Sequence, residues 1–183
     1  MSTRTADEWT ETLRDGSRVR IRAIRPEDAA AQSAFIDGLS AESRRLLFLG
    51  GIAHLRDEEL RRLCSPDCVR DMAYVAIAPG TDGEHIGVSR YASERPACEE
   101  AEISVAVADA WQHRGLATLL LRRLIDHART HGIKRLYSMD AAANERMRRL
   151  ARRVGFTEEP DPKDVHQVIY SLRLDEPSDG GRK

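Results

Sequence analysis

The amino-acid sequence predicts an α/β layer structure in which helices pack against a mixed β-sheet. Strand-like and helix-like hydrophobic periodicities alternate along the chain, in the order hairpin, strand, helix, strand, helix, strand. The chain has 183 residues, which suits one domain with a real core, and no internal repeat or low-complexity linker divides it. We therefore expect one domain over residues 13–174, with flexible polar ends at residues 1–12 and 175–183.

One strand and three helices are expected in the first part of the domain. Residues 17–24 (SRVRIRAI) alternate apolar and charged side chains, as a half-buried strand does. Pro26 stands where it can open a helix over residues 27–39. A second helix is expected from residue 40 to about residue 49, because its first residues include serines that suit a helix start. A short polar helix follows over residues 57–64.

Three strands are expected next. Residues 72–78 and 85–91 read as strands, and the turn-forming sequence PGTDG between them, residues 79–83, predicts that they form a hairpin. Residues 101–107 form the third strand.

The last part of the chain alternates helix and strand. Leucines recur at helical spacing within residues 115–130, and a strand follows over residues 135–140. A second helix begins after Asn144, where apolar residues share one helix face. The domain closes with strands near Phe156 and over residues 165–174.

Composition and charge exclude several classes of protein. Lysine and arginine number 29 and aspartate and glutamate number 30, so the net charge of −1 gives no reason to expect nucleic acid or an anionic membrane as a partner. No signal segment opens the sequence, and no apolar run approaches the roughly 20 residues that span a bilayer. We expect a cytoplasmic protein with reduced cysteines. The three cysteines lack the further ligands of a zinc site, so no metal is expected.

The turn between the strand at residues 101–107 and the following helix has an unusual composition. Residues 112–117 read QHRGLA, in the pattern Gln-x-x-Gly-x-Ala. The first N–H groups of a helix lack intrahelical partners and the helix dipole favours an anion there, while Gly115 allows close approach to the backbone. This turn therefore suits a pyrophosphate, although a tight turn needs the same glycine. The helices that follow are rich in arginine, which indicates either an electropositive region or a solvated face.

Several motifs together resemble a known family. The strand residues Val105-Ala106-Val107, the turn at 112–117, Asn144, and Gly155-Phe156 are similar to the acyl-coenzyme A motifs of the GNAT N-acetyltransferases. The resemblance extends over residues 13–174. Within the family, the segments LRDGSRVRIRAIRPEDAAA and AEISVAVADAWQHRGLA resemble the bacterial protein lysine acetyltransferases most. The resemblance implies the GNAT fold, with a mixed, mostly antiparallel central sheet and helices on both faces.

The resemblance also implies a binding site for acetyl-coenzyme A (acetyl-CoA) as co-substrate. Val105 and Val107 would offer main-chain groups to the pantetheine arm, and Asn144 would hydrogen-bond the same arm or simply cap its helix. The backbone of the turn would hold the pyrophosphate through Gln112, His113, Arg114, Gly115, Leu116 and Ala117.

Acyl transfer to an amine requires a neutral amine, and a lysine is neutral in only about one molecule in a few thousand at pH 7, which costs roughly 4 to 5 kcal/mol. A positioned base is therefore expected. Strand alternation places Glu100, Glu102 and Ser104 on one face. Glu102 is the predicted general base, because the protein-acetylating relatives have a glutamate at this place. Glu100 is the second candidate, and both could instead be solvent-facing charges.

One position departs from the family. Many members have a tyrosine seven residues after the asparagine, where it serves as general acid for the leaving thiolate, but this chain has Ala151. Water could protonate a thiolate with a pKa near 8.5 instead. Tyr91, Tyr137 and Tyr170 are further candidates that the sequence does not rank.

These features predict an N-acetyltransferase that moves an acetyl group from acetyl-CoA to a primary amine by direct attack, without a metal. The favoured acceptor is a protein lysine, such as one in an acyl-CoA synthetase. The alternatives are a small amine or polyamine as acceptor, or a sensor that binds acyl-CoA without turnover. Helices within residues 26–64 are expected to wall the acceptor groove, and their mixture of charges does not identify the acceptor.

Overall fold

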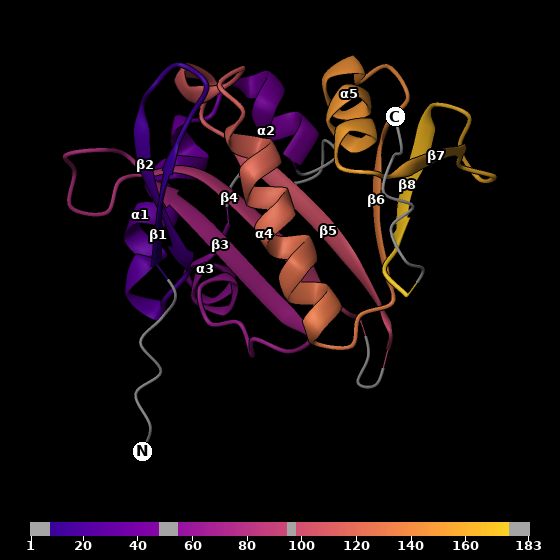
Figure 1. Cartoon of the computed structure of the whole chain (residues 1–183), viewed down its shortest axis with the longest axis horizontal. Helices are drawn as coiled ribbons and strands as arrows, with labels where there is room; N and C mark the ends of the chain where they lie inside the picture. Colours follow the sequence, from indigo (N-terminus) through magenta and orange to yellow (C-terminus); the bar gives the residue numbers. More distant parts are fainter. Residues whose placement is uncertain (1–7, 48–54, 95–97, 176–183) are drawn as a thin grey trace.

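A computed structural model describes residues 8–47, 55–94 and 98–175 (Figure 1). Its strands form one sheet in the order β1-β2-β3-β4-β5-β6-β8-β7. Every neighbouring pair is antiparallel except β5 and β6, which run parallel, so the expected mixed, mostly antiparallel sheet is confirmed. The strands are β1 (Glu8–Thr12), β2 (Arg18–Ala23), β3 (Asp71–Ile77), β4 (His85–Ala92), β5 (Glu100–Val107), β6 (Arg135–Ala141), β7 (Thr157–Pro160) and β8 (Gln167–Arg173).

Helices cover both faces of this sheet, also as expected. The long helix α4 lies across β3, β4 and β5 on one face, and α1 and α3 pack together on the other (Figure 1). The apolar side of α5 joins the core on the α4 face. The helices are α1 (Ala29–Gly38), α2 (Ala41–Leu47), α3 (Asp57–Leu63), α4 (Leu116–Thr130) and α5 (Glu145–Arg153), with short 3-10 turns at Pro26–Asp28 and Asp109–Trp111.

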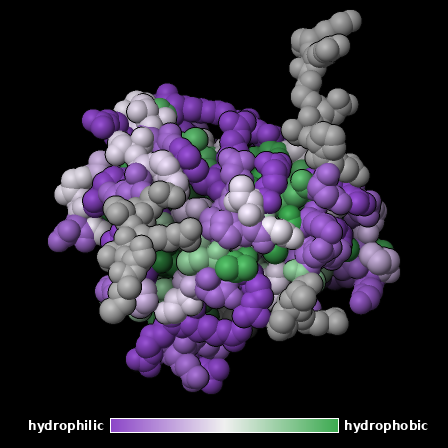
Figure 2. Space-filling model, turned by 60° about the horizontal axis from the view of Figure 1, so that its bottom comes forward, coloured by the Kyte–Doolittle hydropathy of each residue, from purple (hydrophilic) through white to green (hydrophobic). Residues whose placement is uncertain are grey.

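The two faces have separate cores. The leucines of α4 that follow the helical repeat, among them Leu120, Leu121 and Leu124, are buried against the sheet in the larger cluster. On the opposite face, Phe35 of α1 and Leu60 of α3 are buried in a smaller cluster. Figure 2 shows one side of the molecule, where hydrophilic side chains surround smaller hydrophobic areas. No helix in the described part of the chain is long and apolar enough to cross a membrane.

The N-terminal segment corrects the expectation of a flexible end over residues 1–12. Glu8–Thr12 form the edge strand β1, which pairs antiparallel with β2; residues 1–7 lie outside the described residues. The strand can be mostly polar because its side chains alternate between exposed and half-buried positions and none is fully buried. Trp9 packs edge-on against Tyr74, with ring centroids 5.5 Å apart, and under the guanidinium of Arg123 at 4.6 Å. These long-range contacts hold a strand that has little apolar periodicity of its own.

Other element boundaries differ by a few residues. The helix expected over residues 27–39 begins with the 3-10 turn, and α1 starts at Ala29. The helix expected to end near residue 49 is described only to Leu47, so its end lies outside the described residues. The last strand starts at Gln167, because the Asp164 carboxylate accepts the N–H of His166 at 2.9 Å and closes a turn there.

A buried ion pair joins β2 to the turn that precedes α1. Arg22 donates two hydrogen bonds to the Asp28 carboxylate, at 2.6 and 2.7 Å, and both residues are more than nine-tenths buried. The N–H of Arg25 donates to the same carboxylate at 2.8 Å. His85 lies beside the pair and binds Gln32 of α1 at 3.0 Å; burial lowers the pKa of its imidazole, which favours the neutral form. The cluster fixes the position of α1 on the sheet.

We predict that Asp28→Asn lowers the free energy of unfolding by about 3–5 kcal/mol, because it leaves the Arg22 guanidinium buried without its charged partner. Urea unfolding followed by circular dichroism would measure the loss. The matched control is Glu8→Gln, which removes the partner of Arg20 from a solvent-exposed pair, with an expected cost of about 0–1 kcal/mol. Equal costs for the two variants would contradict this role of the buried pair.

Candidate active site

The parallel pairing between β5 and β6 covers only three residue pairs. Glu100, Ala101 and Glu102 pair with residues 135–137, and pairing then stops, although β5 continues to Val107 and β6 to Ala141. Beyond this point β5 remains paired with β4, and β6 with β8. The two strands therefore diverge, and their facing edges carry backbone groups that are not used by the ladder between them.

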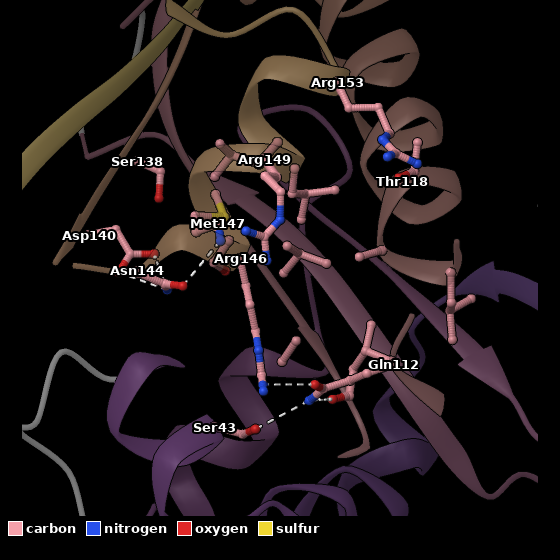
Figure 3. A pocket seen from close by; sticks show the side chains of 18 of the residues that line it. Ser43, Gln112, Thr118, Ser138, Asp140, Asn144, Arg146, Met147, Arg149 and Arg153 are labelled. Carbon is pink, nitrogen blue, oxygen red and sulfur yellow. Dashed lines mark hydrogen bonds between the residues drawn. The ribbon is translucent and has the colours of Figure 1, made fainter. Parts of the chain in front are cut away.

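A cavity of about 730 Å³ opens where the strands diverge (Figure 3). Its walls come from β5, β6, the turn before α4, the first turn of α4, and α5. Almost all of the site residues expected from the sequence line it: Glu102, Val105, Val107, Gln112, His113, Gly115, Leu116, Ala117 and Asn144. Arg114 does not line it. Its side chain pairs with Asp15 at 2.8 Å and lies over the Trp111 ring at 4.7 Å, so only its main chain belongs to the turn.

The turn at 112–117 has the backbone of an anion site. His113 has φ +63° and Gly115 has φ +91°, with Arg114 between them outside this left-handed region. Such alternation directs successive N–H groups into one concavity. Gly115 is the N-cap of α4 and has no side chain to satisfy the free N–H groups of the first turn. Arg14 lies beside this glycine, so a β-carbon there would meet its Nε at 3.4 Å.

The Gln112 side chain joins the walls of the cavity. Its amide nitrogen donates to the Val107 carbonyl at 3.2 Å and to the Ser43 hydroxyl of α2 at 3.3 Å. Its amide oxygen accepts a hydrogen bond from Arg146 of α5 at 3.2 Å (Figure 3). Sequence reasoning assigned the backbone of this residue to a cofactor and missed the bridging role of its side chain, which depends on contacts distant in sequence.

Asn144 caps α5, which is one of the two roles expected for it. Its side-chain oxygen accepts the Met147 N–H at 3.1 Å, and its amide nitrogen donates to both carboxylate oxygens of Asp140 at 3.1 and 3.2 Å. Asp140 is buried at the cavity wall, and burial raises the pKa of its carboxyl above the usual range. Sequence analysis missed Asp140. An acidic residue at the end of a predicted strand could have marked it as a candidate site residue.

The arginines of α5 divide between two sides of the helix. Arg148 and Arg152 pair with Glu158 of β7, at 3.0 and 3.6 Å. Arg149 and Arg153 line the cavity instead, and neither has a carboxylate partner among the residues that the structure describes. Part of the arginine-rich region predicted from the sequence is therefore an electropositive cavity wall, and part is neutralised by β7.

Glu102 lines the cavity at the last position of β5 that pairs with β6. The residue as a whole is open to solvent, but partial desolvation of its carboxyl at the cavity raises its pKa, and the charge of Glu94 raises it further. Glu100 does not line the cavity, and its carboxylate pairs with Arg135 at 3.1 Å. The predicted alternation is confirmed, because Glu100, Glu102 and Ser104 are exposed while Ala101 and Ile103 are buried. The geometry thus separates the two candidate bases.

None of the candidate tyrosines lines the cavity within the described residues. Tyr91 and Tyr170 are fully buried, and the Tyr91 hydroxyl donates to the Val69 carbonyl at 3.0 Å. Ala151 is buried in the core, and its methyl side chain has no hydroxyl to offer. Across the described ranges, no group of three or more histidine, cysteine, aspartate or glutamate side chains is arranged to hold a metal ion.

Among the described side chains of the expected acceptor wall, one reaches the cavity. Ser43 of α2 lines it, and Asp109 accepts hydrogen bonds from Ser43 at 2.9 Å and from Ser40 at 3.0 Å. These bonds fix α2 beside the end of β5. Residues 48–54, which belong to the same predicted wall, lie outside the described residues.

Comparison with known proteins shows which family this chain resembles. The family model for the acetyltransferase (GNAT) domain matches residues 18–157. Acetyltransferase PA5475 from Pseudomonas aeruginosa is 42% identical over 172 residues, which cover 92% of this chain and 90% of that protein. The crystal structure of the GNAT domain of S. lividans PAT has a TM-score of 0.80 at 29% identity, over 91% of this chain and 96% of that one.

A further structure supports the fold alone. RimL, a ribosomal L7/L12 alpha-N-protein acetyltransferase solved in complex with coenzyme A, has a TM-score of 0.67 at 21% identity, over 86% of this chain and 94% of that one. The family model and the 42% identical relative each cover most of the chain. The chain therefore belongs to the GNAT acetyltransferase family and is an acyl-CoA-dependent N-acetyltransferase.

Proposed function

We propose that the protein acetylates lysine side chains of other proteins, using acetyl-CoA as co-substrate and Glu102 as the general base. The observation that carries the proposal is the arrangement of one cavity, which has an anion-binding turn in one wall and a carboxyl of raised pKa at the divergence of the strands. The cavity thus offers sites for an acyl donor rich in phosphate and for an amine that must lose a proton.

The residues present fit coenzyme A in three respects. The free N–H groups around His113 and Gly115 suit the pyrophosphate, and the arginines of α5 add positive charge to the same cavity. The diverging edge of β5 at Val105 and Val107 offers main-chain groups to the amides of the pantetheine arm, as a neighbouring strand would accept them. Asn144 keeps a lone pair on its side-chain oxygen for the same arm while it caps α5.

The chemistry assigned to Glu102 is proton removal from the attacking amine, directly or through a water. A carboxylate of raised pKa accepts a proton more readily than an ordinary glutamate at neutral pH. Glu94 adds negative charge near this end of the cavity, which attracts a cationic amine before it is deprotonated. A protein lysine is the acceptor that we propose, because the sequence resembles protein lysine acetyltransferases most.

We predict that Gly115→Ala weakens coenzyme A binding about 10-fold or more, because a β-carbon at φ +91° costs about 1–2 kcal/mol and displaces the N–H groups of the turn. Isothermal titration would measure the affinity. Gly132→Ala is the matched control, since Gly132 has φ +82° just beyond the other end of α4, with open space around its β-carbon position. It should lose similar stability and keep its affinity. Equal affinities in the two variants would count against the turn as the anion site.

We predict that Glu102→Gln lowers turnover by about 10²-fold or more and leaves coenzyme A affinity nearly unchanged, because it removes only the base. Thiol release from acetyl-CoA would be measured with an acyl-CoA synthetase that has a free active-site lysine, and separately with a panel of small amines. Glu100→Gln is the control, because its carboxylate is held by Arg135 outside the cavity.

The outcomes of this experiment separate the alternatives. Turnover on the synthetase that is lost only in Glu102→Gln supports a protein lysine acetyltransferase. Turnover on small amines alone assigns the protein to small-molecule acetylation. Tight binding of acetyl-CoA with no thiol release on any acceptor supports an acyl-CoA sensor. A loss in Glu100→Gln with full activity in Glu102→Gln transfers the role of base to Glu100.

We predict that Glu94→Gln moves the acidic limb of the kcat/KM profile to lower pH. The base is active as a carboxylate, and the neighbouring charge of Glu94 raises its pKa, so removal of that charge lets the carboxyl ionise at lower pH. Rates on one acceptor across a pH series would measure the shift. Glu99→Gln, which removes the partner of Lys134 from an exposed pair, should leave the limb in place. Identical shifts in both variants would argue against the specific coupling of Glu94 to the base.

A further inference from the structure

Ser138 of β6 is a buried polar residue at the cavity that the proposed function does not use. It is 8% exposed and lines the cavity, where Figure 3 places it on the wall formed by β6. Its hydroxyl has no hydrogen-bond partner among the residues that the structure describes, and it is not one of the fully buried unpartnered atoms, so it is open to the cavity. A hydroxyl that is open to a cavity and has no protein partner is free to donate to a ligand atom bound there.

The register of the sheet places Ser138 and Glu102 on opposite faces. Glu102 pairs with Tyr137, so these two side chains share a face and Ser138, the next residue of β6, has the other one. The Glu102 face also carries Ala106, which packs on the cluster of α1 and α3. The Ser138 face carries Leu136, which belongs to the core under α4 and α5.

This arrangement suits an acyl transfer, in which the attacking amine and the leaving sulfur need different groups. The attacking amine loses its proton on one side of the thioester carbonyl, while the sulfur departs on another side with the electron pair of the C–S bond. A base on one face and a hydrogen-bond donor on the other therefore serve different atoms of the same reaction. The place where strands β5 and β6 separate, beside Glu102 and Ser138, is open to both faces.

The polar groups next to Ser138, at the end of β6 and the start of α5, are already engaged. The Asp140 carboxylate accepts two hydrogen bonds from Asn144 and one from the Ala141 N–H, so it acts as an acceptor. The amide nitrogen of Asn144 is used in these bonds. Ala151 of α5, on the same side, has only a methyl group. Ser138 is thus the hydroxyl donor that β6 presents to the cavity.

We propose that the Ser138 hydroxyl donates a hydrogen bond to the sulfur of the leaving thiolate, which makes it a catalytic residue; the proposal rests on the function given above. The amine nitrogen forms a bond to the carbonyl carbon, and Glu102 receives the amine proton. The C–S bond breaks with its electron pair on sulfur, and the thiolate takes a proton from water. Ser138 keeps its own proton throughout and stabilises the charge that develops on sulfur.

Disulfide trapping tests the position of the sulfur without measuring activity. Ser138→Cys, incubated with the disulfide of coenzyme A, should form a mixed disulfide with coenzyme A, read by intact-protein mass spectrometry. Met139→Cys is the matched control, because it is adjacent on β6 but on the opposite face, and its position is more exposed at 37%. The wild type gives the background of the three native cysteines.

We expect Ser138→Cys to be trapped at least about 10-fold faster than Met139→Cys, and an excess of acetyl-CoA to suppress the reaction. Faster or equal trapping of the more exposed Met139→Cys would overturn the assignment. So would trapping of Ser138→Cys that acetyl-CoA does not suppress, since the thiol would then react outside the donor site.

Kinetics test the role of the hydroxyl. Ser138→Ala should lower kcat about 10-fold, with coenzyme A affinity from isothermal titration unchanged, and Ser138→Thr should restore most of the loss because it keeps the hydroxyl. Full activity of Ser138→Ala, or an equal loss in Ser138→Thr, would overturn the role. A wild type that binds no coenzyme A, or shows no turnover on any amine, would instead refute the proposed function itself.

Discussion

The short parallel pairing between β5 and β6 is the constraint on which the rest of the site depends. Two polar side chains fix the ends of the diverging strands. Gln112 holds the end of β5 through the Val107 carbonyl, and Asn144 holds the end of β6 through Asp140. Arg146 of α5 then joins the two anchors by its hydrogen bond to Gln112. The two anchors are therefore linked through α5, which Asn144 caps and which carries Arg146, so the width of the cavity does not depend on loop packing alone.

Charge is distributed unevenly along this cavity although the whole chain is close to neutral. The turn before α4 and the cavity-lining arginines of α5 make one part positive, whereas Glu102 and its neighbour Glu94 make the other part negative. Low-dielectric walls limit the screening of both groups. A donor with several phosphates and a cationic acceptor would thus be drawn to different ends, which favours one productive orientation over the reverse.

Sequence patterns were sufficient where a local period determines the structure. The leucines of α4 and the alternation along β5 assigned the core face and the Glu102 face correctly, and Asn144 was recognisable as a helix cap. The strand β1 was missed, because its stability comes from Tyr74 and Arg123, which are distant in sequence. Likewise, only the point at which pairing stops brings Ser138 and Asp140 to the cavity, and no local pattern encodes that point.

The same geometry offers a physical account of a chain that has alanine where many relatives have tyrosine. A side chain at position 151 would start from the core, since Ala151 does not line the cavity, whereas Ser138 of β6 lines it close to the divergence of the strands. A short serine on β6 can therefore serve where a tyrosine on α5 would otherwise be needed. Serine is a far weaker acid than tyrosine, so this solution supplies charge stabilisation without proton transfer. A thiolate, whose conjugate acid has a pKa near 8.5, requires no more than that to leave.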